Sequence, residues 1–322
     1  MPNISIIIPI YNGENFVEKS VKTILENKID KEVILIDDGS NDNTYDICNK
    51  LAVDNSCIRV IRQDHKGVSA ARNLGINLAN GKYIYFFDAD DFVDEDFLEK
   101  LLSYAKKYNN ALICFGYIKE SKGKILFRSF HIKSNYLKNA EAFNFIINNK
   151  YSGGYLWNKL FITKIIKESD LRFNEDIRIS EDLLFTIEYL DILKEIVYVN
   201  EHKYHYIIHQ NNTINKKSKS NCMSRIAALH GVKKIFLKNN YDIRAIDYLK
   251  ERELVSTILY LIKNKENPSE IKDLQKELLK CKIVFIDNGY KYYKVVLTHI
   301  YSLLPIYLTT QFYKKKEKDN KK

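Results

Sequence analysis

Two aspartates separated by one residue follow an apolar stretch and form the clearest candidate for a metal site in the sequence. Asp88-Ala89-Asp90 comes directly after the predicted strand Tyr83–Phe87. Two carboxylates at this spacing can both approach one hard divalent cation, and Mg²⁺ or Mn²⁺ suits a ligand shell that phosphate oxygens complete. Aspartates after a strand also cap helices, a structural role that Asp91 or Asp94 could take. The motif by itself leaves both interpretations open.

Three further polar segments stand where strands are expected to end or helices to begin: Pro9-Ile10-Tyr11-Asn12, Asp37-Asp38-Gly39-Ser40 and Gly67-Val68-Ser69-Ala70-Ala71-Arg72-Asn73. Asp38 could accept a hydrogen bond from a base or a ribose, and Gly39 would let the backbone approach a ligand closely. Arg72 carries a fork of donors that matches phosphate, near a helix start where the dipole favours anions. Turns, helix starts and a solvated face would explain each segment separately. Four such segments at one edge favour a ligand site.

Strands alternating with helices must bring these segments together. The apolar patterns predict strands at Ile4–Ile10, Val33–Ile36, Ile58–Ile61 and Tyr83–Phe87, and helices at Glu14–Glu26, from about Thr44, at Val68–Ala79 and at Asp94–Lys107. This alternation predicts an α/β fold, a mostly parallel sheet with helices on both faces. In such sheets ligands gather at the carboxyl ends of the strands, and the polar segments lie at those ends.

The pattern changes in the rest of the chain. A strand is expected at Ala111–Tyr117 and a hairpin around Lys122-Gly123-Lys124. Beyond residue 218 the periodicity is almost wholly helical, and the predicted helices are Arg225–Leu237, Ile243–Ile262 and Ile271–Leu279. We therefore expect one domain over residues 1–215, with halves at 1–110 and 111–215, and a helical C-terminal region over 216–322.

Composition narrows the class of protein. The chain has 322 residues, of which 45% are hydrophobic and 29% charged, a balance that excludes collagen-like fibres and small disulfide scaffolds. Five scattered cysteines without C-x-x-C spacing indicate reduced thiols and no zinc site, and the apolar start indicates a first strand rather than a signal peptide. A cytoplasmic location is expected. The formal net charge of +10 favours an acidic partner, but without a basic motif interleaved with aromatics we expect no nucleic acid.

In order and spacing, these motifs resemble those of the family 2 glycosyltransferases, in particular the members that build bacterial capsules and exopolysaccharides. The segments that carry the resemblance are Ile8–Asn12, Ile36–Thr44, Gly67–Asn73, Asp88–Asp91, Trp157–Phe161 and Ser180–Phe185. They cover about residues 3–215. The resemblance implies a glycosyltransferase type-A fold, a nucleotide-diphosphate sugar donor with uridine as the expected base, and inverting transfer of a hexose or an N-acetylhexosamine. The half at 1–110 would then bind the donor and the half at 111–215 the acceptor.

The resemblance also implies roles for individual residues. Those on the donor side would be Pro9, Tyr11, Asn12, Asp38 and Gly39 at the nucleoside, Arg72 steadying the nucleotide, Asp88 and Ala89 at the ribose or sugar, and Asp90 holding Mn²⁺ or Mg²⁺. Asp182 would be the catalytic base with Glu181 beside it. Those on the acceptor side would be Trp157, Asn158 and Lys159.

Structural alternatives exist for several of these residues. Glu181 and Asp182 could instead form a capping pair for a helix at Leu183–Leu193, with Ser180 as N-cap, and both roles are compatible. Trp157 could stack on a sugar or belong to the core.

A histidine near residue 210 is a further metal candidate. His209 matches the histidine of a Tyr-Arg-x-His segment found in related enzymes, and its imidazole could complete the metal shell or contact the diphosphate. This chain departs from that pattern, with Ile207 where the arginine is usual and Thr213 displaced from the serine position. His202 and His205 are expected on the surface of a strand.

The C-terminal segment Lys291–Tyr313 is aromatic and apolar, and the tail after it holds six lysines and two acids. Such a segment can lie in an anionic leaflet, which would place the enzyme at the inner face of the cell membrane and suit a saccharide acceptor carried on a lipid. It can equally pack on the catalytic domain.

Three other functions compete. A sugar nucleotidyltransferase would begin with a basic, glycine-rich loop, whereas Tyr11–Glu14 is acidic. A basic module that binds membranes or nucleic acid, or a pseudoenzyme that binds donor without transfer, would also fit parts of the sequence.

Overall fold

Two compact units make up the chain, Met1–Asn215 and Lys216–Lys322. The computed structural model describes residues 1–129, 135–147, 153–209 and 218–280. The C-terminal segment Lys291–Tyr313, its basic tail and Thr213 lie outside these residues. Within the described part, no helix is both long enough and apolar enough to cross a membrane.

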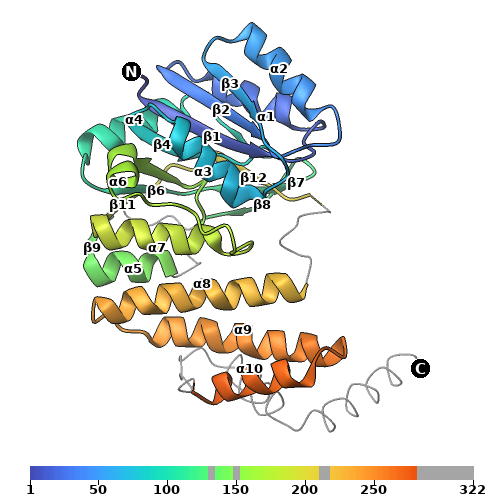
Figure 1. Cartoon of the computed structure of the whole chain (residues 1–322). Coiled ribbons are helices and arrows are strands. Elements are labelled where there is room, and N and C mark those ends of the chain that lie inside the picture. The colour runs from blue at the N-terminus through green and yellow to red at the C-terminus, as the bar shows by residue number, and fades with distance from the viewer. Residues whose placement is uncertain (130–134, 148–152, 210–217, 281–322) are drawn as a thin grey trace. The chain divides into compact units, whose positions relative to one another are not determined.

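An eight-stranded sheet forms the centre of the first unit, with the order β3-β2-β1-β4-β10-β6-β11-β9 (Figure 1). Its strands are β1 (Ile4–Ile10), β2 (Lys31–Asp37), β3 (Ile58–Arg62), β4 (Tyr83–Phe86), β6 (Leu112–Phe115), β9 (Asn135–Lys138), β10 (Lys159–Ile162) and β11 (Glu195–Val199). The first four are parallel, whereas β10 is antiparallel to both its neighbours and β9 to β11. The predicted mostly parallel sheet is confirmed.

Helices cover both faces of this sheet. They are α1 (Val17–Glu26), α2 (Thr44–Asp54), α3 (Val68–Leu78), α4 (Phe97–Lys107), α5 (Asn139–Ile147), α6 (Thr163–Glu168) and α7 (Glu181–Leu193). On one face, Ile8 of β1 shares a buried cluster with Val21 of α1 and Leu101 of α4. On the other, Gly75 of α3 lies so close to Ile7 that a Cβ would overlap the isoleucine, which lets this helix pack directly on the strand. Alternate residues of β1 thus face opposite layers.

A second sheet of four strands, β5-β12-β7-β8, stands beside the carboxyl end of β4. Its strands are β5 (Phe92–Val93), β7 (Ile118–Ser121), β8 (Lys124–Arg128) and β12 (Tyr204–Ile207). The predicted hairpin is confirmed, because β7 and β8 pair antiparallel through Lys122 and Gly123. Both turn residues have positive φ, 49° and 74°, as a tight two-residue hairpin turn requires.

The second unit is helical in its described part, as predicted. Its helices are α8 (Lys219–Lys238), α9 (Arg244–Lys263) and α10 (Pro268–Lys280), drawn orange to red in Figure 1. Ser218 caps α8 by accepting a hydrogen bond of 3.1 Å from the N–H of Asn221, so this helix begins before the predicted Arg225. Leu254, Ile258 and Leu274 form part of its core.

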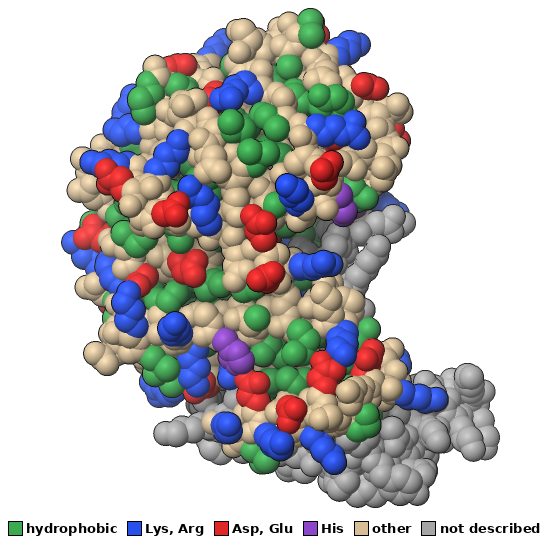
Figure 2. Space-filling view, in the orientation of Figure 1, with side chains coloured by type: hydrophobic (Ala, Val, Ile, Leu, Met, Phe, Trp, Pro, Cys, Tyr) green, Lys and Arg blue, Asp and Glu red, His purple; other side chains and the backbone are tan. Residues whose placement is uncertain are grey.

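The excess positive charge is dispersed on the visible face. Lys and Arg side chains alternate with Asp and Glu over the surface that Figure 2 shows, and they do not gather into one basic patch in that view. On this face, therefore, the net charge of +10 does not define a binding site.

Candidate active site

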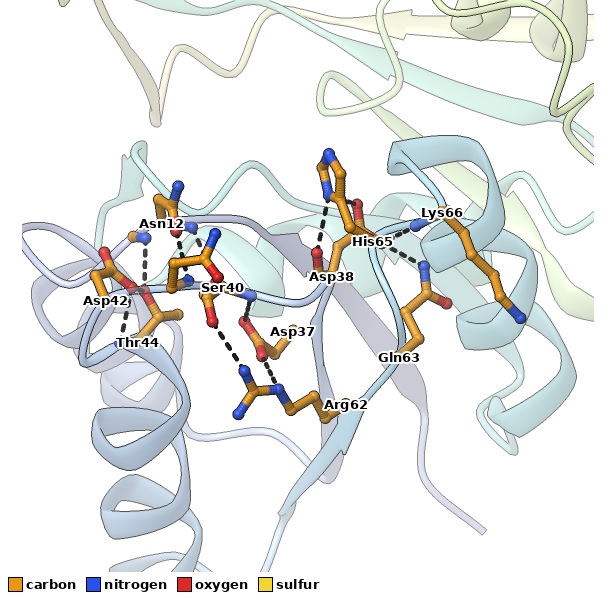
Figure 3. Close-up of polar contacts among 12 residues, drawn as sticks. Asn12, Asp37, Asp38, Ser40, Asp42, Thr44, Arg62, Gln63, His65 and Lys66 are labelled. Carbon is orange, nitrogen blue, oxygen red and sulfur yellow. Dashed lines mark hydrogen bonds and ion pairs between the residues drawn. The ribbon is translucent and has the colours of Figure 1, made fainter.

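The carboxylate of Asp38 organises the loop that follows β3 (Figure 3). It accepts hydrogen bonds from the backbone N–H groups of Lys66 (2.8 Å) and Gly67 (2.9 Å) and from Nε2 of Gln63 (2.7 Å). The residue is only 4% exposed. Its carboxylate therefore fixes the shape of the loop over residues 63–67, whatever further contact it makes with a ligand.

A pocket of 650 Å³ opens beside this loop, lined by Gly39 and by residues 62–66. Tyr11, which is 45% exposed, stacks on the ring of His65 with centroids 4.2 Å apart and planes 26° from parallel. Gly39 has φ of +72°, and a Cβ there would lie 3.0 Å from the backbone nitrogen of His65. The combination of an exposed aromatic face and polar groups suits a nucleobase.

Hydrogen bonds join the loop after β1 to the loop after β2. Ser40 Oγ accepts from the N–H of Asn12 (2.9 Å), and Asn12 Oδ1 accepts from the N–H of Asn41 (2.9 Å). Asn12 has φ of 52°, a left-handed conformation that asparagine tolerates. Pro9 is half-buried within β1 and pairs in register with Ile36. The structure thus places the predicted nucleoside residues at one sheet edge.

Arg72 joins three elements at the other side of this edge. Its Nη1 donates to Oε1 of Glu181 at 2.7 Å, and its Nη2 lies 3.7 Å from Oδ1 of Asp88. Arg72 is 8% exposed and its guanidinium lies 5.5 Å from the ring centre of Phe173. Burial raises the pKa of Asp88 to about 6, while the charge of Arg72 opposes that rise. One buried cation therefore connects α3, the strand end at residue 88 and the start of α7.

Asp182 is half-buried and differs from its neighbour Glu181 in its contacts. Among the described residues, its carboxylate accepts one hydrogen bond, from the backbone N–H of Leu183 at 2.8 Å. Burial and the nearby charge of Glu181 raise the pKa of Asp182 to about 7, against the lowering effects of Arg72 and Lys159. A carboxylate with this pKa is suited to accept a proton near neutral pH.

The start of α7 differs from the prediction. The helix begins at Glu181 rather than Leu183, and Ser180 has φ of 67° and makes no capping hydrogen bond with its side chain. The backbone carbonyl of Ser180 still accepts a hydrogen bond of 3.2 Å from the N–H of Leu184. Ser180 therefore holds the expected N-cap position, but its side chain does not cap the helix, and the Glu181-Asp182 pair lies in the first turn.

Asp90 and His209 form the candidate cation site. Asp90 Oδ2 lies 3.5 Å from Nε2 of His209, and the two side chains are 34% and 41% exposed. Burial raises the pKa of Asp90, which the charge of His209 opposes. Within the described residues, no cluster of three or more acidic, histidine or cysteine side chains could hold a metal alone. Two donors nevertheless fit Mg²⁺ or Mn²⁺, which commonly takes its other ligands from phosphate and water.

A pocket of 660 Å³ adjoins this pair, bounded by the N-terminal half of α1, the β7–β8 turn and the end of β12. Phe16 at the N-cap of α1, Lys19 of the helix and Lys122 of the turn contribute to it. The ring of Phe16 lies 6.0 Å from that of His209. His209 therefore occupies the wall between the helix and the aspartate.

Asp91, next to Asp90, has a structural role. It is 1% exposed and accepts hydrogen bonds from the hydroxyl of Tyr204 and from the backbone N–H of Ile207 (2.7 Å). Neither Asp91 nor Asp94 caps α4, because both carboxylates contact β12 instead: Asp94 Oδ1 lies 3.1 Å from Nε2 of His205. The residue at the N-cap of α4 is Asp96, so the capping alternative holds for neither Asp91 nor Asp94.

His205 lies in β12, but its side chain is not at the surface, so the prediction of a surface position is wrong. Its side chain is 13% exposed and Phe92 stacks on it with centroids 4.5 Å apart, while Nδ1 contacts Glu120 at 2.7 Å. His202 lies before β12 and places Nε2 at 2.9 Å from the carbonyl of Ser129. Both histidines hold the second sheet together.

An aromatic stack fills the space beside Asp182. Trp157, 6% exposed, lies parallel to Tyr204 and Tyr155, with centroids 4.7 Å and 4.9 Å away. Tyr155 is half-buried, and the charge of Asp182 adds to the burial that raises its pKa. The neighbouring Gly154 is so close to α7 that a Cβ there would be 2.6 Å from the Cα of Leu183. Tyr155 is thus a half-buried member of the stack that interacts electrostatically with the Asp182 carboxylate.

Comparison with known proteins decides the family. Residues 5–169 match the sequence model of glycosyl transferase family 2. The chain belongs to this family. It is 31% identical over 217 residues to the uncharacterized glycosyltransferase EpsJ of Bacillus subtilis, a match that covers 64% of this chain and 61% of EpsJ. It is 28% identical over 225 residues to the poly(ribitol-phosphate) beta-N-acetylglucosaminyltransferase TarP of Staphylococcus aureus, covering 68% of this chain and 66% of TarP. The matched part of this chain thus spans no more than about two thirds of the length of either relative.

Solved structures identify the fold. The structure of S. aureus TarS in complex with UDP-GlcNAc superimposes with a TM-score of 0.72 at 15% identity, over 98% of this chain and 92% of that one. The glycosyltransferase type-A fold expected from the sequence is thereby confirmed.

The prediction that Trp157, Asn158 and Lys159 contact the acceptor is wrong. Asn158 and Lys159 are completely buried and Trp157 nearly so, which leaves them no surface for a saccharide. Lys159 Nζ instead donates to the carbonyls of Gly153 (2.8 Å) and Tyr155 (2.6 Å) and to Oδ1 of Asn158 (2.8 Å), and burial lowers its pKa to about 8. It fixes the loop that carries Tyr155. Tyr155 was not among the predicted site residues, although it stands two positions before Trp157 in the sequence.

Proposed function

We propose that this family 2 member transfers a sugar from a nucleotide-diphosphate donor, with UDP as the expected nucleotide, to a hydroxyl of a surface glycan, with inversion. The observation that carries the proposal is the difference between the two carboxylates at the start of α7. Glu181 accepts a hydrogen bond of 2.7 Å from Arg72, whereas Asp182 lies outside this ion pair and has a pKa of about 7. The name of TarP and the UDP-GlcNAc bound to TarS support this substrate class.

Asp182 serves as the general base. Its carboxylate accepts the proton of the acceptor hydroxyl as that oxygen attacks the anomeric carbon and the bond to the diphosphate breaks. Because its pKa is near the working pH, it is both substantially ionised and sufficiently basic. Such assistance accelerates transfer by about 10²–10⁴-fold. Asp182 acts here rather than Glu181, whose carboxylate is bound to Arg72.

The donor lies along the sheet edge. Tyr11 stacks on the nucleobase, and Asp38 keeps the loop over residues 63–67 in place for it. Asp88 contacts the ribose or donor sugar, oriented by Arg72. Asp90 and His209 would hold Mn²⁺ or Mg²⁺, which supplies positive charge to the diphosphate when bound.

The acceptor sugar lies on Tyr155. The ring is half-buried and backed by Trp157 at 4.9 Å, so it forms a rigid apolar face beside the base. Sugar rings present apolar C–H faces that pack well on such surfaces. A saccharide carried on a lipid or a growing polymer would fit an open site of this kind. We place the enzyme at the cytoplasmic face of the membrane, because the scattered cysteine spacing of the sequence is typical of proteins from a reducing compartment.

The competing functions are less well supported. Membership of the glycosyltransferase family argues against a sugar nucleotidyltransferase and against a basic binding module. The half-exposed Asp90 and Asp182 argue against a pseudoenzyme, since both carboxylates remain available.

The test is turnover of UDP-GlcNAc, UDP-glucose and UDP-galactose with poly(ribitol phosphate) as trial acceptor, followed as UDP release with and without Mn²⁺. We expect release from at least one donor, slowed about 10²–10⁴-fold in Asp182→Asn. Slow hydrolysis of the donor by water reports the donor site even if the trial acceptor is wrong. If Asp182→Asn and the wild type release UDP equally, the assignment of the base is wrong.

A further inference from the structure

The β7–β8 hairpin carries an exposed apolar ridge. All five residues of β8, Lys124–Arg128, are exposed, although the middle three are large and apolar. Ile125 is 51%, Leu126 59% and Phe127 37% exposed. Contiguous exposed apolar patches with a polar rim are typical of surfaces that contact a protein or a membrane. Lys122 and Gly123 of the turn line the pocket beside Asp90 and His209, whereas β8 contributes no residue to that pocket. The docking proposed for this hairpin does not rest on the proposed function.

A bulge turns the centre of this ridge outward. Lys119 of β7 pairs with Phe127, and the next residue, Glu120, pairs with Ile125, so Leu126 has no partner on β7. Bulges of this kind redirect a side chain and interrupt the ladder of an edge strand. β8 is the outer strand of its described sheet, and this interruption makes it a poor template for another strand.

Positive charges flank the ridge. Residues 121–128 contain Lys122, Lys124 and Arg128 and no acidic residue. Antiparallel pairing of two copies about Leu126 would set Lys124 of one opposite Arg128 of the other, and directly opposed like charges destabilise a sheet. A second copy of this chain is therefore a poor occupant. An acidic surface complements both the charge and the apolar centre.

We propose that the hairpin tip, residues 122–128, docks on an anionic lipid surface, with Leu126 and Ile125 at the level of the headgroups and the upper acyl chains. The cations contact lipid phosphates, each contributing roughly a fivefold gain in partitioning. The outer backbone groups of β8 remain at headgroup depth, where water still satisfies them, because an open strand edge is excluded from hydrocarbon.

Tryptophan fluorescence tests this docking locally in the full chain. The chain has one tryptophan, and Trp157 is only 6% exposed, so Leu126→Trp adds a distinct reporter at the tip. Val53→Trp, at a position 86% exposed on α2, is the matched control. Vesicles of brominated phosphatidylglycerol and of brominated phosphatidylcholine supply the quencher.

We expect anionic vesicles to quench the reporter at position 126, with little effect on the one at position 53 and little quenching by zwitterionic vesicles. Lys124→Glu with Arg128→Glu should raise the lipid concentration for half-quenching at least about fivefold. Reversing Lys22 and Lys164, which are 59% and 77% exposed elsewhere, should leave it unchanged. Three results would overturn the proposal: vesicle binding without quenching at position 126, no vesicle binding, or a change in this reporter's emission that follows protein concentration without lipid.

Discussion

Arg72 and Glu181 form a buried ion pair of 2.7 Å between residues 109 positions apart in the sequence. The pair fixes the first turn of α7 against α3 and leaves the adjacent Asp182 outside that contact. Breaking a buried pair exposes an unpaired charge to a poorly solvated site. The catalytic assignment and the stability of this edge therefore depend on the same contact.

Replacing Glu181 tests that dependence. Because the charge of Glu181 raises the pKa of Asp182, Glu181→Gln should lower that pKa and move the acid limb of the pH–rate profile below its wild-type position near pH 7. Activity rises with pH through this limb, since the base must be ionised. The free energy of unfolding should fall by about 1–3 kcal/mol. Glu168→Gln, an exposed control, should change neither; an unmoved limb in Glu181→Gln would contradict the account.

Tyr155 should govern acceptor binding without affecting the donor. Tyr155→Ala removes the apolar face beside Asp182 and should raise the acceptor KM about tenfold or more, a loss of about 1.5 kcal/mol of stacking. Tyr155→Phe keeps the face and should stay near wild type. Donor hydrolysis by water, measured in the same variants, should remain unchanged. Equal KM values in the alanine and phenylalanine variants would exclude a stacking role.

Replacing the adjacent residues Asp90 and Asp91 by alanine should change the free energy of unfolding by very different amounts. Asp91→Ala leaves the buried Tyr204 hydroxyl and Ile207 N–H without their acceptor, and should lower the free energy of unfolding by about 2–4 kcal/mol. Asp90→Ala, at a half-exposed position, should change it by less than about 0.5 kcal/mol. Chemical denaturation of both variants makes the comparison. Similar losses in both would mean that the two roles are not separate.

The raised pKa of Glu188 in α7 should make the free energy of unfolding depend on pH. Burial raises its pKa from 4.5 to about 7, so in this window the folded chain holds a proton that the unfolded chain has lost. The stability that the protonated Glu188 contributes to the folded chain is therefore fully present below about pH 4.5 and is lost as the pH rises toward 7. Glu188→Gln should raise the free energy of unfolding at pH 8 by about 1–3 kcal/mol and leave it unchanged at pH 4. A gain of equal size at both pH values would refute this explanation.

The sequence predicted elements with strong periodicity and missed those without it. β1 lies at Ile4–Ile10 as predicted, because a run of β-branched residues has few alternatives. β10 was not predicted, because its four residues, Lys159–Ile162, are too few to show a period. Its antiparallel direction is a tertiary property, set by β4 and β6 on either side.

Some residues of the candidate site could likewise be placed from the sequence, and others could not. Strand topology brought the predicted donor residues to one edge, since parallel strands end on the same side. Lys159 was placed wrongly at the acceptor, because a lysine is expected to be exposed and only the fold shows three carbonyl-type acceptors around it. The lack of a side-chain cap at Ser180 could not be predicted, because its left-handed backbone is not visible from residue type.

The most direct test of the central claim is calorimetric titration of the purified chain with UDP, with and without Mn²⁺, alongside Asp90→Ala. The account predicts binding that Mn²⁺ strengthens and that Asp90→Ala reduces to the level seen without metal, while the variant keeps its fold. UDP binding of equal strength with and without Mn²⁺, or Mn²⁺-dependent binding that survives Asp90→Ala, would contradict it.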